Sequence, residues 1–505
     1  MNLEKKSVSI EKLKTGIEGF DLISNGGLSK DRTTLVAGTS GSAKTVFSCQ
    51  FLAAGVQDMD EHGVFVTFEE SPSDICRNMS GFGWEIADWE SKGKWAFVDA
   101  SPDPDIEIIE IGAYDMGALL ARVEYAINKV KAKRLVIDSL GAIFDRFSER
   151  NIVRSELFRI AASLKKMGVT SIMTAERAEE YGDIARFRVE EFVVDNVIIM
   201  RNVLEASKRR RSIEILKFRG ASHQKGEYPF TILPDEGVII IPLSAMELIH
   251  SSSNIRITSG NKELDDICNG GFFRDSIILI SGATGTGKTL IATEFVSGGI
   301  ESGERCLFLG FEESRGQLFR NASGWGRDFE RMEQDGKLKA YCEYPESASL
   351  EDHLIVIKKM IDAFKPDRIA IDSLSALERV STVKSFREFV ISLTAFIKEK
   401  EIAGMFTAVT ASLMGGTSIT EAHISTITDS IILLRYVETY GEMQRAITVL
   451  KMRGSMHDKA IREFNIDGQG LHIGKPFRNV TGILSGMSQH VLPEDVERVG
   501  ELFKE

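Results

Sequence analysis

The strongest constraint on this chain is that it repeats itself. Two glycine-rich segments that end in Lys-Thr, GTSGSAKT and GATGTGKT, lie in separate halves of the sequence. Three further pairs of matching segments follow in the same order: VFVTFEES (64–71) and LFLGFEES (307–314), RLVIDSLGAIF (134–144) and RIAIDSLSALE (368–378), ILKFRGASHQKGEYPF (215–230) and VLKMRGSMHDKAIREF (449–464). Lys44 and Lys288 are 244 residues apart, and Lys217 and Lys451 are 234 apart. The shared order and near-constant spacing indicate an internal duplication.

The length supports the same organisation. At 505 residues the chain is too long for one hydrophobic core and suits two domains. We expect a first domain at 1–247, a second at 248–485 and a C-terminal tail at 486–505, with the serine-rich segment 250–254 as a linker. In each half, short β-branched runs alternate with amphipathic helical stretches. This alternation predicts an α/β fold, a mostly parallel sheet flanked by helices, with an antiparallel edge formed by hairpins at the end of each half.

Composition excludes several classes of protein. The formal net charge of −12 argues against a protein that coats DNA, because phosphate contacts need clustered Lys and Arg. The basic run 208–211 could face nucleic acid, but a solvated hairpin turn between strands at 197–200 and 213–218 is the favoured interpretation. Apolar runs are far shorter than a membrane span of roughly 20 residues, and the N-terminus lacks a signal-peptide core. Five scattered cysteines without a CxxC pair predict reduced thiols, no zinc site and a cytoplasmic protein.

Each Lys-Thr segment predicts a phosphate-binding loop. The second matches G-x-x-x-x-G-K-[ST] in full, between a strand and an apolar helix, so its backbone amides should bind phosphates, Lys288 the β- and γ-phosphates and Thr289 a Mg²⁺ ion. In the first loop Ala43 replaces the last glycine, which leaves ATP binding expected and turnover open. The predicted loop residues are Gly38, Thr39, Ser40, Gly41, Ser42, Ala43, Lys44 and Thr45, and Gly282, Ala283, Thr284, Gly285, Thr286, Gly287, Lys288, Thr289 and Leu290.

Carboxylates between and after these loops predict the remaining chemistry. Asp138 and Asp372 each close an apolar strand, as in a Walker B motif, and should hold Mg²⁺ together with Thr45 and Thr289. The pairs Glu69-Glu70 and Glu312-Glu313 end another strand near each loop, so one acid of each pair can accept a proton from the attacking water or hydroxyl. Adjacent acids raise each other's pKa, which suits a base. Glu312 is also a predicted metal ligand.

With these motifs, residues from about 14 to 485 resemble the KaiC family, the double-domain RecA-like ATPases of the cyanobacterial circadian clock. The strings that carry the resemblance include GVFVTFEES, ASPDPD, EEYGDIAR, GGFFRDSIIL, YPESASLEDHL, KPDRIAIDSLSAL and HISTITDSIILL. The resemblance implies two tandem RecA-like P-loop domains, assembled as a hexameric double ring with ATP at the subunit interfaces. It also implies slow ATP hydrolysis in the first ring, and serine/threonine autophosphorylation and dephosphorylation in the second.

The resemblance implies further nucleotide contacts. Cations of KFRGASH and KMRGSMH should reach ATP on the neighbouring subunit, where they would offset γ-phosphate charge. Met456 stands where the second domain of the family usually has an aromatic residue. The implied ATP-binding residues outside the loops are Lys217, Phe218, Arg219, Gly220, His223 and Asp235 in the first half, and Trp325, Arg445, Lys451, Met452, Arg453, Gly454, Ser455, Met456, His457 and Lys459 in the second.

The string HISTITD at 423–429 separates the two halves. From the residues alone it reads as a strand rich in Ser and Thr, since β-branched residues favour strands. The resemblance instead identifies Ser425 and Thr426 as phosphoacceptors and Thr420 as a nearby accessory hydroxyl. At the 234-residue shift the first half has Glu191 and Phe192. Acceptor hydroxyls therefore occur there only in the second half, and each added phosphate would bring a charge of roughly −2 to an interface.

The resemblance also guides expectations about partners. It implies a KaiB-like protein partner, whereas PEDVERVGELFKE (493–505) does not match the family's tail, where the activator KaiA binds, so dependence on a KaiA-like activator is not expected. Two other functions stay open from the residues: a DNA-dependent recombinase or helicase on the same fold, for which nucleic acid binding is not expected from the charge, and a non-catalytic scaffold that ATP holds together.

Overall fold

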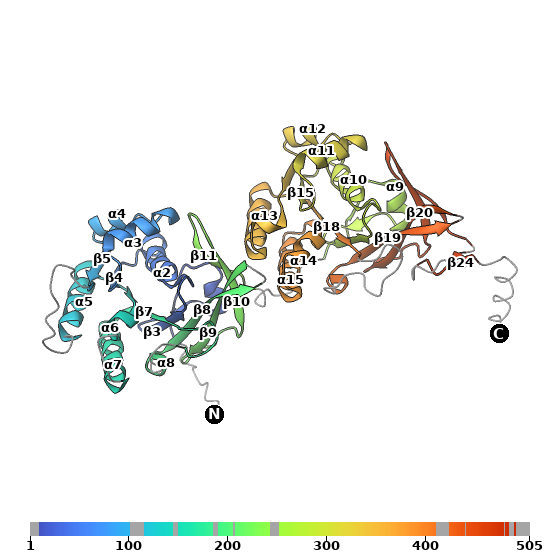
Figure 1. The fold of residues 1–505 in the computed structure, drawn as a ribbon. Coiled ribbons are helices and arrows are strands. Elements are labelled where there is room, and N and C mark those ends of the chain that lie inside the picture. The colour runs from blue at the N-terminus through green and yellow to red at the C-terminus, as the bar shows by residue number, and fades with distance from the viewer. Residues whose placement is uncertain are drawn as a thin grey trace, which may run out of the picture. The chain divides into compact units, whose positions relative to one another are not determined.

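The computed structural model divides the chain into two compact units, Met1–Ala245 and Met246–Glu505, each built around its own sheet (Figure 1). It describes residues 10–101, 116–144, 150–184, 190–205, 208–242, 252–410, 424–439, 441–478, 480–483 and 489–490. The predicted accessory hydroxyl Thr420 and most of the predicted tail lie outside these residues.

The first unit holds a nine-stranded sheet with the order β11-β10-β9-β8-β3-β7-β6-β4-β5. Its strands are β3 (Thr33–Gly38), β4 (Gly63–Thr67), β5 (Trp95–Asp99), β6 (Arg134–Asp138), β7 (Thr170–Glu176), β8 (Asn196–Glu205), β9 (Lys208–Phe218), β10 (Glu227–Leu233) and β11 (Gly237–Ile240), and β1 (Lys12–Leu13) pairs with β2 (Leu28–Ser29). Its helices are α1 (Phe20–Ile23), α2 (Lys44–Asp58), α3 (Pro72–Met79), α4 (Ile86–Ser91), α5 (Met116–Val130), α6 (Leu140–Phe144), α7 (Arg150–Lys166) and α8 (Glu190–Val193).

The second unit repeats this order as β22-β21-β20-β19-β14-β18-β17-β15-β16. Its strands are β14 (Ile277–Gly282), β15 (Cys306–Gly310), β16 (Leu338–Cys342), β17 (Arg368–Asp372), β18 (Ala403–Val409), β19 (Ser430–Thr439), β20 (Glu442–Met452), β21 (Arg462–Asp467) and β22 (Gly470–Pro476), with the short pairs β12 (Arg256–Ile257) and β13 (Phe272–Phe273), and β23 (Val480–Thr481) and β24 (Gln489–His490). Its helices are α9 (Lys262–Ile267), α10 (Lys288–Glu301), α11 (Arg315–Gly324), α12 (Phe329–Gln334), α13 (Leu350–Phe364), α14 (Leu374–Arg379) and α15 (Val383–Glu399).

In both sheets the six strands from β8 to β5, and from β19 to β16, are parallel, and the last three are antiparallel hairpin strands. This confirms the predicted tandem RecA-like architecture with an antiparallel edge. The parallel strands are buried on both faces, as expected when helices cover both sides. Along β4, for example, Val64 and Val66 join the core under α5 and α7, while Phe65 joins the core under α2.

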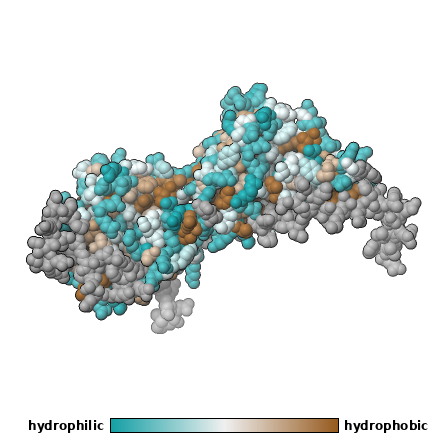
Figure 2. Space-filling view, viewed as in Figure 1, coloured by the Kyte–Doolittle hydropathy of each residue, from teal (hydrophilic) through white to brown (hydrophobic). Residues whose placement is uncertain are grey.

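Buried residues thus form two cores on opposite faces of the first sheet. On the face of the molecule in Figure 2, hydrophobic residues form only scattered patches among hydrophilic ones. No described helix is long and apolar enough to span a bilayer.

The basic run 208–211 is not the hairpin turn that the sequence suggests. It is the first part of β9 and pairs residue by residue with β8, from Lys208 opposite Glu205 to Arg211 opposite Asn202. The β-propensity of the flanking residues extends the ladder through the charged run, because every second side chain of an edge hairpin can stay in water.

Candidate nucleotide and phosphoryl-transfer sites

Each Lys-Thr loop joins a central strand to a helix. In the first half it connects β3 to α2, and in the second β14 to α10. The residue before the lysine adopts a left-handed backbone in both, with φ of 71° at Ala43 and 104° at Gly287. A non-glycine residue pays roughly 1–2 kcal/mol for this conformation. The first loop therefore keeps the fold of the second one despite Ala43.

The two loop lysines lie inside the curled backbone. Lys44 Nζ donates hydrogen bonds to the carbonyl oxygens of Gly38 (2.9 Å) and Thr39 (3.0 Å), and Lys288 Nζ donates to that of Ala283 (2.9 Å). Burial lowers the pKa of both ammonium groups, although carboxylates nearby oppose this. A buried cation inside a ring of backbone amides is suited to an incoming phosphate chain.

The predicted magnesium ligands are in contact in both halves. Thr45 Oγ1 donates to Asp138 Oδ2 at 2.7 Å, and Thr289 Oγ1 donates to Asp372 Oδ2 at 2.6 Å. The second carboxylate oxygen of each aspartate accepts a hydrogen bond from a threonine of the neighbouring strand, Thr174 or Thr407. Burial raises the pKa of Asp138 and Asp372, and the hydroxyl donors counteract it.

This hydroxyl and carboxylate pair fits a magnesium ion, which takes few protein oxygens when nucleotide phosphates supply the rest. Within the described residues no group of three or more His, Cys, Asp or Glu side chains is gathered for a metal. When bound with ATP, the ion would neutralise charge on the phosphates. Glu312, the other predicted ligand, accepts a hydrogen bond from Arg379 at 3.2 Å.

The paired glutamates follow their strands instead of ending them. β4 stops at Thr67 and β15 at Gly310, so the acids lie in the turns beyond, where the strand hydrogen bonds have ended. In each pair the second acid is held by an asparagine: Asn78 Nδ2 donates to Glu70 Oε2 at 3.1 Å, and Asn321 Nδ2 to Glu313 Oε2 at 3.0 Å.

The first acids are held differently. Glu69 accepts a hydrogen bond from Ser139 Oγ (2.7 Å), while its counterpart Glu312 faces Arg379. The pKa of Glu313 is raised, mainly by burial and then by the charge of Asp372. The adjacent Glu312 also raises the pKa of Glu313, but less than burial and Asp372 do. The mutual effect of the paired acids, which the sequence predicts, is therefore only a small part of this shift.

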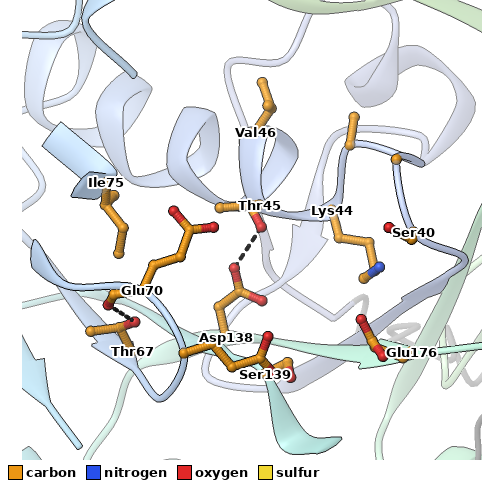
Figure 3. A pocket seen from close by; sticks show the side chains of 13 residues that line it. Ser40, Lys44, Thr45, Val46, Thr67, Glu70, Ile75, Asp138, Ser139 and Glu176 are labelled. Carbon is orange, nitrogen blue, oxygen red and sulfur yellow. Dashed lines mark hydrogen bonds between the residues drawn. The ribbon is translucent and has the colours of Figure 1, made fainter. Parts of the chain in front are cut away.

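A cavity of about 300 Å³ joins these groups in the first half. Figure 3 shows Lys44 and Glu176 on one side of it, Glu70 on the other, and Asp138 bonded to Thr45 between them. The lining residues are Ser40, Gly41, Ala43, Lys44, Thr45, Val46, Thr67, Glu69, Glu70, Ile75, Asp138, Ser139 and Glu176. The structure thus brings the predicted loop, metal ligands and acids of the first half together.

A second group of predicted contacts lies at the same edge of each sheet as the loop. Asp235, in the turn between β10 and β11, donates its backbone N–H to the carbonyl oxygen of Gly81 at 3.1 Å. In the second half the corresponding turn, between β21 and β22, comes near Gly326, next to the half-buried Trp325. Arg445 lies over the ring of Tyr436, 5.8 Å from its centroid, and its Nε is buried without a partner among the described residues.

The KFRG and KMRG segments lie at the opposite edge. Arg219 N donates to Asp195 O, and Asp195 N donates to Thr33 O, at the first residue of β3. In the second half, Arg453 N donates to Asp429 O, and Asp429 N donates to the carbonyl oxygen of Ile277, the first residue of β14. Each Lys-Thr loop begins at the other end of the same strand, five residues after its first residue. At about 3.3 Å per residue, the two ends of the strand are roughly 17 Å apart.

These segments hold their own chain's backbone in this structure. Lys217 Nζ donates to the carbonyls of Glu191 and Val194, and Lys451 Nζ donates to that of Thr428 at 2.6 Å. Arg453 donates to Thr426 O at 2.9 Å. The other predicted contacts of these segments lie in or just after β9 and β20. They are Phe218, Gly220 and His223 in the first half, and Met452, Gly454, Ser455, Met456, His457 and Lys459 in the second. The cations of these two segments are therefore not brought to the loop of their own unit.

The predicted acceptors lie at this opposite edge as well. Ser425 and Thr426 belong to a short 3₁₀ helix, Ile424–Thr426, just before β19, and not to a strand. Asp429 N binds the carbonyl of Ile277, which fixes the segment at the start of β14. Thr426 is exposed.

Sequence reasoning missed several residues of the sites. Asn78 and Asn321 occupy matching places in the repeated strings RNMSGFGW (77–84) and RNASGWGR (320–327), so the duplication itself was a signal for them. Thr174 and Thr407 recur in the same way as part of TA pairs in β7 and β18. Glu176 has no such counterpart, since Val409 takes its place in β18.

The model of the KaiC ATPase family matches residues 13–245 and again 257–477. The chain belongs to the KaiC family. It is 64% identical over 503 residues to the circadian clock protein KaiC3 of Synechocystis sp., covering 100% of this chain and 99% of that protein. It is 55% identical over 501 residues to the circadian clock oscillator protein KaiC of Thermostichus vulcanus (99% and 96% covered), and 54% identical over 503 residues to that of Synechococcus elongatus (100% and 96% covered).

Membership of the KaiC family agrees with the geometry of both halves. Each half is matched by the ATPase model, and each has a loop lysine, a threonine bonded to an aspartate, and a glutamate bonded to an asparagine. The chain is therefore an ATP-binding ATPase of the KaiC type.

Proposed function

We propose that this protein is a hexameric double-ring ATPase whose second domain (248–485) is a serine/threonine autokinase and autophosphatase, while the first domain (1–247) hydrolyses ATP. It would act in the cytoplasm as a clock-like or signalling protein with a KaiB-like partner, without dependence on a KaiA-like activator. Clock proteins at 54–64% identity support this role.

One observation carries the proposal: the cations of the KFRG and KMRG segments, and the acceptors of the second half, lie at the sheet edge opposite to the ATP loop of their own unit. Arg453 and Thr426 lie at the start of β14, whereas Lys288 follows its end. A side chain cannot reach across the length of the strand, so each loop would be completed by the next subunit of a ring. Groups lent across an interface couple catalysis to assembly.

Exposed apolar side chains beside these cations favour assembly. Phe192, whose carbonyl accepts a hydrogen bond from Arg219, is 62% exposed, and Met456, three residues after Arg453, is 82% exposed. Burial of these side chains against a neighbouring subunit would remove apolar surface from water and so add to the stability of a ring.

In the transfer step, the hydroxyl oxygen of Ser425 or Thr426 of one subunit would attack the γ-phosphorus of ATP on its neighbour. The new O–P bond forms as the bond to the β,γ-bridging oxygen breaks, ADP leaves, and the hydroxyl proton passes to Glu312 or Glu313. The raised pKa of Glu313 suits this role, because a base near the working pH both accepts and later releases a proton. Lys288 would stabilise the charge on the transferring group.

A mixing experiment tests transfer between subunits. One population carries Lys288→Ala, which removes the loop cation but keeps the acceptors, and the other carries Ser425→Ala with Thr426→Ala, which keeps the loop. With Mg-ATP, mass spectrometry should find phosphate on Ser425 or Thr426 of the Lys288→Ala chains only after mixing. Native mass spectrometry would report whether mixed hexamers form. Mixed hexamers without phosphate on these chains would contradict the proposal.

A further inference from the structure

Glu176 occupies a place in the first site that the family motifs do not explain. It is the last residue of β7 and pairs with Gly38, the last residue of β3 before the ATP loop. The carbonyl oxygen of Gly38 accepts two hydrogen bonds, from Lys44 Nζ at 2.9 Å and from the backbone N–H of Arg177 at 3.1 Å. Because Arg177 follows Glu176 directly, this shared carbonyl places Glu176 beside the loop lysine.

The Glu176 side chain faces the cavity. It is exposed and lines the same space as Lys44 and Asp138, and Figure 3 shows its carboxylate on the side where the lysine ammonium lies. Among the described residues it has neither a hydrogen bond nor an ion pair within 4 Å. Glu180 is different, because its carboxylate is used by Thr39 Oγ1 (2.6 Å) and Asn202 N (3.0 Å).

The second half has no acid at this place. Val409 pairs with Gly282 as Glu176 pairs with Gly38, and the next residue, Thr410, again donates its N–H to the glycine carbonyl at 3.2 Å. The carboxylates that act on Lys44 are those of Glu176, Asp138, Glu69 and Glu180, with Glu176 the strongest, whereas Asp372 and Glu312 act on Lys288. The backbone frame is thus the same in both sites, and the charge facing the lysine is not.

We propose that Glu176 sets the nucleotide preference of the first site, because its carboxylate competes with the γ-phosphate of ATP for the Lys44 ammonium. An incoming γ-phosphate brings negative charge to the space that this carboxylate lines. Like charges repel more strongly in a partly buried pocket than in water. ADP lacks that group and is affected less. The first site therefore prefers ATP over ADP less strongly than the second site does.

The inference rests on the proposed ATP site and is tested in the full chain with Lys288→Ala, so that nucleotide occupies the first site alone. Equilibrium dialysis would give Kd for ADP and for a slowly hydrolysed ATP analogue, with and without Glu176→Gln. We expect Glu176→Gln to lower Kd for the analogue about tenfold, or about 1.4 kcal/mol, and to change Kd for ADP much less. Glu179→Gln, which removes a charge from an exposed neighbour outside the cavity, is the matched control and should change neither.

The mirror experiment places the acid in the other site. With Lys44→Ala silencing the first site, Val409→Glu should weaken binding of the analogue at the second site more than binding of ADP. Equal effects on both nucleotides, or unchanged or weaker analogue binding in Glu176→Gln, would overturn the inference. A parent chain that binds neither nucleotide at its first site would instead contradict the proposed function.

Discussion

At the scale of single residues, one buried acid distinguishes the two ATP-loop helices. Glu294, on α10, accepts a hydrogen bond from Leu471 N at 3.0 Å and one from Asn261 Nδ2 at 3.3 Å, and it is 2% exposed. Burial raises its pKa to about 7. Gln50 occupies the matching position of α2 and, with its neutral amide, accepts from Val238 N at 2.7 Å.

This pKa predicts that the stability of the second unit depends on pH. An acid whose pKa is raised from 4.5 to about 7 binds its proton more tightly in the folded state, so the stability is complete at low pH and falls as pH rises through 7. The free energy of unfolding of the second unit should fall by about 3 kcal/mol between pH 4.5 and pH 8. Urea unfolding of the second unit, measured at several pH values in this range, should show this decrease in unfolding free energy with pH. Glu294→Gln should remove the decrease.

Glu301→Gln is the control for this measurement, since it removes a carboxylate from the same helix at a site that is 61% exposed and paired with Arg327. Arg327 and His472 lower the pKa of Glu294 and so oppose part of the effect of burial. A slope that survives Glu294→Gln would assign the pH dependence to a group other than Glu294.

At the scale of elements, α3 and α11 position the acids that we propose to be catalytic. Each follows the acid pair directly and begins at a serine cap: Ser71 accepts from Asp74 N at 3.2 Å, and Ser314 forms a capping box with Gln317. The caps fix where each helix begins and therefore where its asparagine lies.

Loss of either asparagine should slow only the chemistry of its own half. A hydrogen bond to a charged group is worth about 1.5–3 kcal/mol, so Asn78→Ala should lower ATP hydrolysis, and Asn321→Ala phosphate incorporation, by about tenfold or more. ATP affinity should stay unchanged, because neither residue contacts the loop lysine. ADP release and phosphopeptide quantification would measure the two rates separately.

Ser323→Ala, at an exposed position of the same helix and outside its capping box, serves as the control. An equal effect of Asn321→Ala on both rates would indicate general damage to the helix instead of lost positioning.

The sequence predicts the elements that depend on local spacing and misses those that depend on sheet order. The loop, its lysine and the threonine lie within eight consecutive residues, and the Walker B aspartates close apolar runs, so their pattern is visible along the chain. Glu176 reaches the site only because β7 lies between β3 and β6 in the sheet. Likewise, the placement of Ser425 and Thr426 at the edge opposite to the loop follows from the parallel pairing of β19 with β14, which no local pattern specifies.

At the scale of the whole molecule, duplication has produced two units with the same sheet order and different side chains around their loops. Each unit has its own nine-stranded sheet, its own core and its own loop lysine. Among the differences near their loops are single side chains at matching places: Ala43 for Gly287, Glu176 for Val409, and Gln50 for Glu294. The same backbone frame therefore supports two sites with different charge.

This organisation predicts two thermal transitions that ATP shifts independently. A ligand that binds only the folded state stabilises it by about 2.7 kcal/mol at one hundred times Kd. Nucleotide in the first loops should stabilise first units, and nucleotide in the second loops should stabilise second units. In excess Mg-ATP, calorimetry of the full chain should show both transitions moved upward. Lys44→Ala should cancel the shift of one and Lys288→Ala that of the other, because each removes the cation that binds the phosphates. Calorimetry could instead show a single transition whose ATP-dependent shift is abolished by either substitution. That result would mean that the two units unfold together, and it would contradict the prediction.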